Sequence, residues 1–441
     1  MPFPSLRRPA PRRVSLLAFC LALPLAAQSL PYDAAIVVAT APGGGTVAVE
    51  VDLQAGGVTT LPAFSTDAFD PLAIAADPID GSFLLALDRG SSSQIMRRRF
   101  RPNPFEVLLG SVPGHVVELL VDRFGDVLVV TDGSGGAVHR LPRSGGSPTL
   151  VRLAPHAGAA GCRQQLAWHA LVGISGTTTP AGDPKVGDLD LDDGSWILGP
   201  NVLHGFTPRG IVGIADLPTA ASRQLLAHDD GSISIYDVSA GGNPVPATVV
   251  PALPVGGIAA MKTLPLAAGL VLGGATNPAL YSFDPLQAPF GTIQLTTIAN
   301  GLPGAPVDYA AVPPPSPHTL TFDRPCGAAA ELRIAAVSGQ SPQLGNATYG
   351  LRLHQGLPGQ LAWLVLGFGE TMFPFPNGCR LHVAADALTL RTADGGGAAA
   401  VTIPIPSNPV LLGVRFLGQW LQVDGPLPFL VSDSAAIEIG L

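Results

Sequence analysis

The chain is short of charged residues, and Glu and Lys are the scarcest of them. Only 13% of its 441 residues are charged, whereas about a quarter is usual for a soluble protein. Six residues are Glu and two are Lys. The exposed faces of amphipathic helices are built largely from these two types, so the composition excludes long surface helices. Intrinsic disorder is excluded too, because 47% of the residues are hydrophobic and the net charge is only −8.

The residues that are plentiful belong to turns and strands. The chain has 53 Gly and 45 Pro, which interrupt helices and favour turns. Val, Leu and Ile make up much of the remainder, and β-branched residues favour strands. We therefore expect an all-β protein, and its length suits two or three domains.

The first 27 residues have the pattern of an export signal. Four Arg without any acid precede an apolar run at residues 14–27, and the small residues at its end suit cleavage before Gln28. The run is too short to span a bilayer, and no later segment reaches about 18 uninterrupted apolar residues. We expect residues 1–27 to be a signal peptide of a protein exported to the periplasm, cell surface or extracellular space. A buried N-terminal strand is the alternative.

Removal of that segment would leave an acidic protein with little cysteine. The formal net charge would fall from −8 to −12, which disfavours nucleic-acid binding. Of the four cysteines, Cys20 would be lost with the signal peptide. In an oxidising compartment we expect Cys326 and Cys379 to form a disulfide, worth about 4 kcal/mol by loop closure. Cys162 would remain as a buried free thiol.

A unit of four expected strands recurs between about residues 71 and 312. Each copy has an apolar first strand, a strongly apolar second strand, a turn often built on Asp-Gly, an alternating third strand and a weaker fourth. The third copy, which we expect to begin at Cys162, is degenerate. Equivalent first-strand positions lie 45, 49, 46, 46 and 49 residues apart: Leu72, Val117, Leu166, Val212, Ile258 and Val307. This period fits the four-stranded blades of a β-propeller.

The two ends of the repeat region complete one further unit. Residues 306–312 supply a lone first strand, whereas residues 32–57 supply a second and a third strand without a first. Joining them closes a ring and leaves no open sheet edge. We therefore expect a six-bladed β-propeller over residues 28–312, closed by both termini. A string of independent hairpins or a sandwich is the alternative.

Three segments carry a resemblance to a known group of propellers. They are LLALDRG (84–90), LVVTDGSGGAVHRL (128–141) and LLAHDDGSISIYDV (225–238). The chain resembles the six-bladed propellers of the NHL and gluconolactonase-like group. The resemblance implies the fold but no activity, because such strand–turn motifs are general among propellers.

The remainder of the chain has a different organisation. Residues 313–317 (PPPSP) form a stiff spacer. Residues 318–441 lack the repeat and contain about eight short strands between Gly, Pro and Asn turns, which predicts a β-sandwich stapled by the expected disulfide. On the segments NGCRLHV (377–383), IPIPSNP (403–409) and GQWLQVD (418–424), this part is similar to C-terminal β-sandwich modules of secreted bacterial proteins. Its large aromatic residues would form either core or a sugar-stacking platform: Trp363, Phe373, Phe375 and Trp420.

Three acidic residues follow second strands at equivalent places of the repeat: Asp88, Asp132 and Asp229. Such positions surround one mouth of a propeller, where converging carboxylates would hold a cation or polarise a water molecule. Other copies have Ser175 and Gly273 there. Capping of Asp-Gly turns is therefore the alternative.

A second acidic pattern, GDLDLDDG, raises the question of a calcium site at Asp188, Asp190 and Asp192. A calcium loop of the EF-hand type needs Gly directly after the third Asp, and here Gly194 comes one residue late. We favour a strand that directs Leu189 and Leu191 inward and the carboxylates outward, and keep Ca²⁺ as the alternative.

One dense basic run is present, at residues 97–101 (RRRFR). On a strand, Arg98 points opposite to Arg97 and Arg99, so no single face holds them all. We expect a solvated outer strand rather than a binding patch for acidic polymers.

The chain has no common catalytic motif. HExxH, GxSxG, GxGxxG and the P-loop pattern are all missing from the sequence. We therefore predict an exported, non-catalytic binding or scaffold protein whose partner is an extracellular glycan or envelope protein, without nucleic acid and without a transmembrane span. The alternative is a lactonase-like hydrolase or lyase that uses acids at the propeller mouth. A purely structural component of the cell surface is a third possibility.

Overall fold

The computed structural model describes residues 34–441 except 102–103, 162–166, 168, 175–184, 202–210, 217–222, 229, 238–246, 251–256, 265–267, 285–292, 313–315, 328–330 and 424–428. The expected signal peptide, Cys162 and Asp229 lie outside the described residues. Among the described residues there is no α-helix, and none of their helices has the length and apolar character needed to cross a bilayer.

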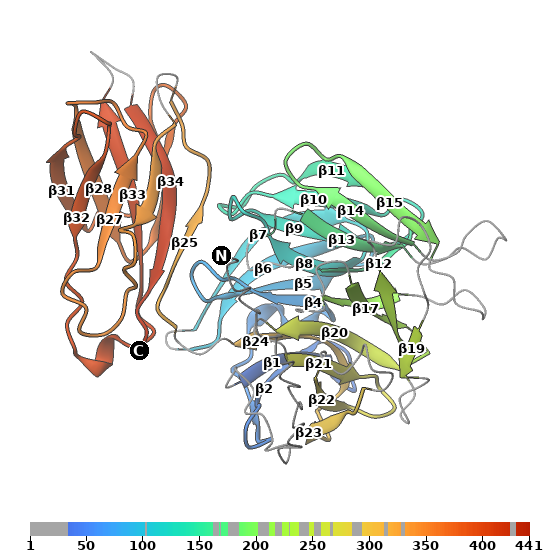
Figure 1. The fold of residues 1–441 in the computed structure, drawn as a ribbon. Coiled ribbons are helices and arrows are strands. Elements are labelled where there is room, and N and C mark those ends of the chain that lie inside the picture. The colour runs from blue at the N-terminus through green and yellow to red at the C-terminus, as the bar shows by residue number, and fades with distance from the viewer. Residues whose placement is uncertain are drawn as a thin grey trace, which may run out of the picture.

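Six four-stranded antiparallel sheets make up the first part of the molecule (Figure 1). The first three are β24 (Ala305–Val312), β1 (Ala34–Thr40), β2 (Thr46–Asp52), β3 (Val58–Thr60); β4 (Pro71–Ala76), β5 (Phe83–Asp88), β6 (Ser92–Arg99), β7 (Phe105–Pro113); and β8 (Val116–Val121), β9 (Val127–Thr131), β10 (Ala137–Leu141), β11 (Thr149–Leu153). The other three are β12 (Ala157–Gly161), β13 (His169–Ile174), β14 (Lys185–Asp190), β15 (Trp196–Asn201); β16 (Ile211–Asp216), β17 (Arg223–His228), β18 (Ile233–Asp237), β19 (Ala247–Val250); and β20 (Ile258–Leu264), β21 (Ala268–Gly273), β22 (Ala279–Phe283), β23 (Thr296–Asn300).

The six sheets form a closed ring. Their first strands contact one another in the order β24, β4, β8, β12, β16, β20 and back to β24. Strand β24, from the end of the repeat region, pairs with β1 from its beginning, from Ala34↔Val312 to Thr40↔Ala305. The expected propeller closed by both ends of the repeat region is confirmed.

Burial of the second strands explains why the blades pack into a ring. In β9 every residue is buried, and in β1 and β5 all but the last are. These strands are apolar on both faces because a neighbouring blade covers each face. At the Asp132-Gly133 turn, Gly133 has φ +84°, a conformation that other residues rarely adopt.

A β-bulge recurs at the same place in all six first strands. The extra residues, which have no partner on the second strand, are Leu72, Val117, Gly158, Val212, Ala259 and Val307. Four of the equivalent positions expected from the sequence are therefore right and two are wrong. Strand β12 lies before Cys162, so the equivalent position in the third blade is Gly158 and not Leu166. In the sixth sheet the equivalent position is Ala259, one residue after Ile258. The sequence of β12 is AGAAG, which carries none of the bulky residues that usually reveal a strand.

The second part of the molecule has two facing sheets. One contains β25 (His318–Phe322), β34 (Phe429–Glu438), β33 (Arg415–Val423), β28 (Leu361–Gly367) and β31 (Ala387–Thr392) in that order, and the other contains β26 (Arg333–Ala336), β27 (Gly350–His354) and β32 (Ala399–Thr402). Both sheets contribute to one core around Trp420, Tyr349 and Leu351. The expected β-sandwich is confirmed.

A hairpin of β29 (Glu370–Pro374) and β30 (Arg380–Val383) covers the outer face of the five-stranded sheet. The expected disulfide joins Cys379, just before β30, to Cys326, which bridges to Val431 of β34. Their Cα atoms are 5.4 Å apart. The disulfide therefore fastens the hairpin to the sheet that it covers.

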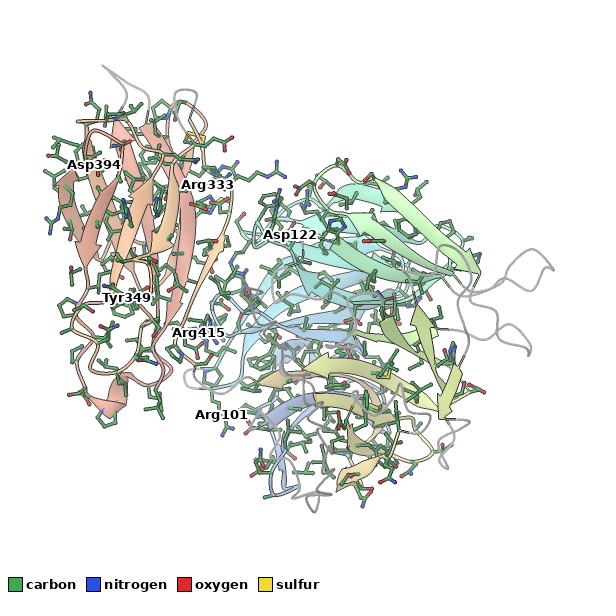
Figure 2. The ribbon with its side chains drawn as sticks, viewed as in Figure 1. Arg101, Asp122, Arg333, Tyr349, Asp394 and Arg415 are labelled. Carbon is green, nitrogen blue, oxygen red and sulfur yellow. A yellow bond between two sulfur atoms is a disulfide. The ribbon has the colours of Figure 1, made fainter. Side chains whose placement is uncertain are left out.

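The sandwich packs beside the second and third sheets of the ring. One apolar cluster includes Ile79 of the propeller together with Phe322 and Val365 of the sandwich. Arg415 lies on the side of the sandwich that faces the propeller (Figure 2), and its guanidinium donates to Pro78 O at 3.4 Å. Gly81 permits this approach, because a Cβ atom there would lie 2.7 Å from Arg415 Nη1.

Ion pairs join the two parts of the chain at the same place. Arg143 Nε donates to Glu370 Oε1 at 2.7 Å, and Arg97 Nη1 lies 3.6 Å from Glu370 Oε2. Asp77 accepts from Arg143, while Asp80 lies 3.6 Å from its guanidinium. We call these five residues the interface network.

The basic run is not a solvated strand, so that expectation was wrong. The side chain of Arg98 is only 1% exposed and pairs with Asp67 at 2.7 Å and Glu106 at 2.6 Å. Arg97 belongs to the interface network, and its side chain is 12% exposed. The alternation along β6 is as expected, but acids lie on both of its faces: Asp67 and Glu106 beside Arg98, and Glu370 of the sandwich beside Arg97.

Candidate functional site

Polar residues meet at the axis of the propeller. The residues directly after the six bulges are Ala73, Glu118, Ala159, Gly213, Ala260 and Asp308. Four of them are small and two are acidic. A bulge turns the following side chain away from the regular alternation of the strand. Glu118 and Asp308 are buried as a result of this position, with 7% and 4% of their surface exposed.

Lys262 brings the two acids together. Its ammonium Nζ lies 2.9 Å from Asp308 Oδ2 and 3.2 Å from Glu118 Oε1, and it also donates to Ile74 O at 3.0 Å. Lys262 is on β20 and Glu118 is on β8, and two blades separate these strands in either direction around the ring. The Lys262 side chain therefore spans the axis to an opposite blade. We call Lys262, Glu118 and Asp308 the axial cluster.

Further hydrogen bonds hold the axial cluster in place. Asp308 Oδ2 accepts from Ile74 N at 2.8 Å, and Oδ1 accepts from Tyr309 N at 2.7 Å. The Tyr309 hydroxyl accepts from Lys262 N and donates to Leu270 O, both at 2.7 Å. Four of the six blades are thus connected through one buried polar group.

The environment determines the protonation of each member. Burial raises the pKa of Glu118 to about 7, although Lys262 opposes the shift. Burial alone would lower the pKa of Lys262, but Asp308 and Glu118 together raise it above its ordinary value. Burial also raises the pKa of Tyr309 well above its usual range. At neutral pH Lys262 is therefore an ammonium ion, which is not a nucleophile.

The axial cluster was missed in the sequence, although a signal for it exists. Glu118 and Lys262 each stand in an apolar strand, within VVELLV and IAAMKTL, in a chain with six Glu and two Lys. A rare charged residue in an apolar strand indicates a paired group. The partners themselves were not deducible, because they meet only when opposite blades close into a ring.

Two of the three candidate acids that follow second strands, Asp88 and Asp132, lie in the described residues, and Asp229 does not. Asp88 Oδ1 accepts from Gly90 N at 2.7 Å, as a turn cap does, and lies 3.7 Å from His115 Nδ1. Asp132 is exposed, and its N–H donates to His115 O at 2.9 Å. In the described part of the chain no group of three His, Cys, Asp or Glu residues is close enough to hold a metal ion. A ligand site formed with Asp229 stays a prediction.

The three acids of the GDLDLDDG segment point outward, as expected. Leu189 and Leu191 are buried, whereas the side chains of Asp188, Asp190 and Asp192 are 35–43% exposed. Asp188 Oδ1 lies 3.2 Å from His169 Nδ1, and Asp192 pairs instead with Arg123. Asp190 Oδ2 also lies near His169, 3.9 Å from its Nε2, so Asp188 and Asp190 share one imidazole while Asp192 faces Arg123. Calcium binding there stays a prediction.

The four aromatic residues of the sandwich do not form one platform. Trp420 is fully buried between the two sheets. Phe373 is 58% exposed, and Phe375 stacks on Phe429 with ring centroids 4.4 Å apart. Trp363 of β28 is half-buried and packs against the same apolar cluster as Phe375, and sugar stacking there stays a prediction.

Three solved structures are similar to this chain at low identity. A protein of unknown function from Bacteroides caccae has 13% identity and a TM-score of 0.42, and the match covers 64% of this chain and 99% of that one. A putative 6-phosphogluconolactonase from Bacteroides uniformis has 15% identity and a TM-score of 0.40, with 63% and 99% covered. The structure of YCF48 bound to D1 peptide has 12% identity and a TM-score of 0.39, and the match covers 60% of this chain and 82% of that one. No family model and no curated protein matches the chain.

Proposed function

We propose that this chain is an exported, non-catalytic binding or scaffold protein. The observation that supports this most is the axial cluster: the Lys262 side chain fills the axis and pairs with Glu118 of an opposite blade at 3.2 Å. Its ammonium ion is fully engaged by two carboxylates and a backbone carbonyl. Groups held in this way stabilise the ring rather than react, which leaves binding to the outer surfaces.

Export is part of the same proposal. The signal-peptide pattern of residues 1–27 supports it, and the Cys326–Cys379 disulfide is compatible with an oxidising compartment. We place the propeller in the NHL and gluconolactonase-like group on its repeated strand–turn motifs. The partner that we propose is an extracellular glycan or an envelope protein, and not a nucleic acid.

The test is a binding screen with the purified protein against immobilised extracellular glycans and envelope proteins. We expect at least one saturable interaction that persists in Lys262→Arg, which keeps the positive charge at the axis. Thermal unfolding of the variant shows whether it is folded. Uniformly negative binding, together with turnover of a lactone or ester substrate that Lys262→Arg abolishes, would contradict the proposal.

The alternative function, a lactonase-like hydrolase or lyase, draws support from a different place. Asp88 and His115 lie 3.7 Å apart at the propeller mouth, and both side chains are partly exposed, at 31% and 49%. If they act on a substrate, Asp88→Asn should abolish hydrolysis of a panel of lactones and esters without changing the unfolding midpoint. Asp52→Asn, which alters an exposed turn cap that is not one of the three candidate acids, is the matched variant.

A further inference from the structure

The two edges of the five-stranded sheet have different surroundings. Strand β25 forms one edge and lies toward the propeller, whereas β31 forms the other edge on the far side of the sandwich (Figure 1). Asp394, which follows β31, is on that far side as well (Figure 2). In the described residues β31 pairs with β28 alone. One edge of the sheet is thus open.

The open edge is apolar. Leu388 and Leu390 of β31 are 62% and 46% exposed. They lie opposite Val365 and Trp363 of β28, so the two leucines extend the outer apolar face of the sheet to its last strand. Most proteins protect such an edge with charges or proline, because an exposed apolar edge pairs readily with another strand.

The backbone of β31 is arranged for such pairing. Ala393 N, just beyond the strand, donates to Gln360 O at 2.9 Å. Backbone groups alternate in an antiparallel pair, so Ala387, Thr389 and Arg391 face β28 while Leu388, Leu390 and Thr392 direct theirs outward. The Leu390 carbonyl accepts from its neighbour's side chain, Arg391 Nη1, at 2.9 Å. A flexible guanidinium occupies an acceptor that a partner strand would use.

The sequence of the edge is self-complementary. In the segment Ala387–Leu388–Thr389–Leu390–Arg391, an antiparallel pair of two copies centred on Thr389 places Leu388 opposite Leu390. The long Arg391 then faces the small Ala387, and Thr389 faces Thr389. No like charges are opposed, and apolar residues face each other where the backbone bonds form.

We propose that β31 pairs with β31 of a second copy of this chain about a two-fold axis at Thr389. The two five-stranded sheets then form one continuous sheet, and the guanidinium of Arg391 leaves the Leu390 carbonyl to the Leu388 N–H of the other copy. An isologous contact of this kind closes on itself and stops at the dimer. This inference is independent of the proposed function.

The size of the contact sets the expected affinity. Two strands of six residues bury less than the roughly 1,200 Å² of a stable interface. We therefore expect a reversible dimer whose fraction rises with concentration, measurable by sedimentation velocity on the full chain.

Leu390→Pro should make the chain monomeric at every concentration, because it removes an outward N–H and no bond to β28. Leu361→Ser, which alters an exposed leucine of β28 away from the edge, should leave the dimer unchanged.

Cysteine cross-linking tests the register without relying on a proline variant that folds. Residues facing each other at Thr389 would form a non-hydrogen-bonded pair with Cα atoms about 4.5 Å apart, within disulfide range. Thr389→Cys should give a disulfide-linked dimer on non-reducing gels, and Ala387→Cys should not. A parental chain that is monomeric at all concentrations would overturn the proposal, as would equal cross-linking of both cysteine variants or a dimer that survives Leu390→Pro.

Discussion

The propeller axis and the domain interface both place a cation between carboxylates, but the two cations connect different parts of the molecule. Lys262 joins blades of a single ring, through acids that are 6–9% exposed. Arg143 joins the propeller to the sandwich, through Glu370, whose side chain is 25% exposed. The axial cluster therefore connects blades within one ring, whereas the interface network fastens together two parts of the chain.

The side chain that supplies the cation suits each location, arginine at the domain interface and lysine at the propeller axis. A guanidinium has five donors in a rigid fork, so Arg143 serves Asp77 and Glu370 at once across a flat interface. The flexible lysine stem reaches across the axis and delivers one compact charge to two carboxylates. Substitutions at the two places should accordingly differ in size and in which part of the molecule responds.

Loss of the axial cation should have the largest effect. Lys262→Met leaves two buried carboxylates without their partner, and breaking a buried ion pair typically costs about 3–5 kcal/mol. Urea unfolding of the full chain, followed by tryptophan fluorescence and circular dichroism, measures the loss. The exposed pair provides the control: Arg101 is 66% exposed beside Glu50, so Arg101→Met should change stability by less than about 1 kcal/mol.

A second substitution at the axis shows whether the stability lost in Lys262→Met comes from the interaction between Lys262 and Glu118. Without Lys262 the Glu118 carboxyl must take up a proton to stay buried, because Lys262 is the group that opposes the rise of its pKa. Glu118→Gln replaces it by a neutral group, so the double variant should be more stable than Lys262→Met alone. Additive losses would contradict the view that the two side chains act as one unit.

The strands and their closure could be predicted because they depend on local patterns. The apolar second strands and the complementary ends, residues 32–57 and 306–312, indicate a ring before any contact is known. The first strand of the third blade escaped notice because Ala and Gly alone form β12. Packing between blades, which accepts small residues there, outweighs the intrinsic preference for bulky ones.

The charged clusters depend on contacts between distant segments, and the sequence did not reveal them. Lys262 meets Glu118 across the ring, and Arg98 meets acids from two other segments. A pattern on one strand shows which way a side chain points, as it did for Leu189 and Asp188, but not what lies opposite. The axial cluster was accordingly not predicted from the strand patterns.

The titration of Glu118 should make the stability of the folded chain depend on pH. Its pKa is about 7 in the folded chain, against an ordinary value of 4.5, so the folded state gains a proton before the unfolded state does. Stability should therefore rise as the pH falls from about 7 toward 4.5. Glu118→Gln removes this group, and its stability should vary less over that interval than that of the parent.

Unfolding midpoints in urea at pH 5, 6, 7 and 8 measure the difference. Asp122 and Asp433, whose pKa values burial raises to about 6, act in the same direction in both proteins and so cancel in the comparison. Parallel pH curves for parent and variant would contradict the assignment of a near-neutral pKa to Glu118.

The smallest effect should come from the interface. Glu370→Gln removes the negative charge that Arg143 and Arg97 share, but Asp77 and Asp80 remain beside Arg143. We expect a loss of about 1.5–3 kcal/mol, the usual range for a hydrogen bond to a charged group, confined to the contact between the two parts. Calorimetry should then separate the unfolding of the sandwich from that of the propeller. Glu331→Gln, at a side chain that is 74% exposed beside Arg333, should change neither. A single, uniformly lowered transition in Glu370→Gln would mean that the interface, like the axis, is part of one cooperative unit.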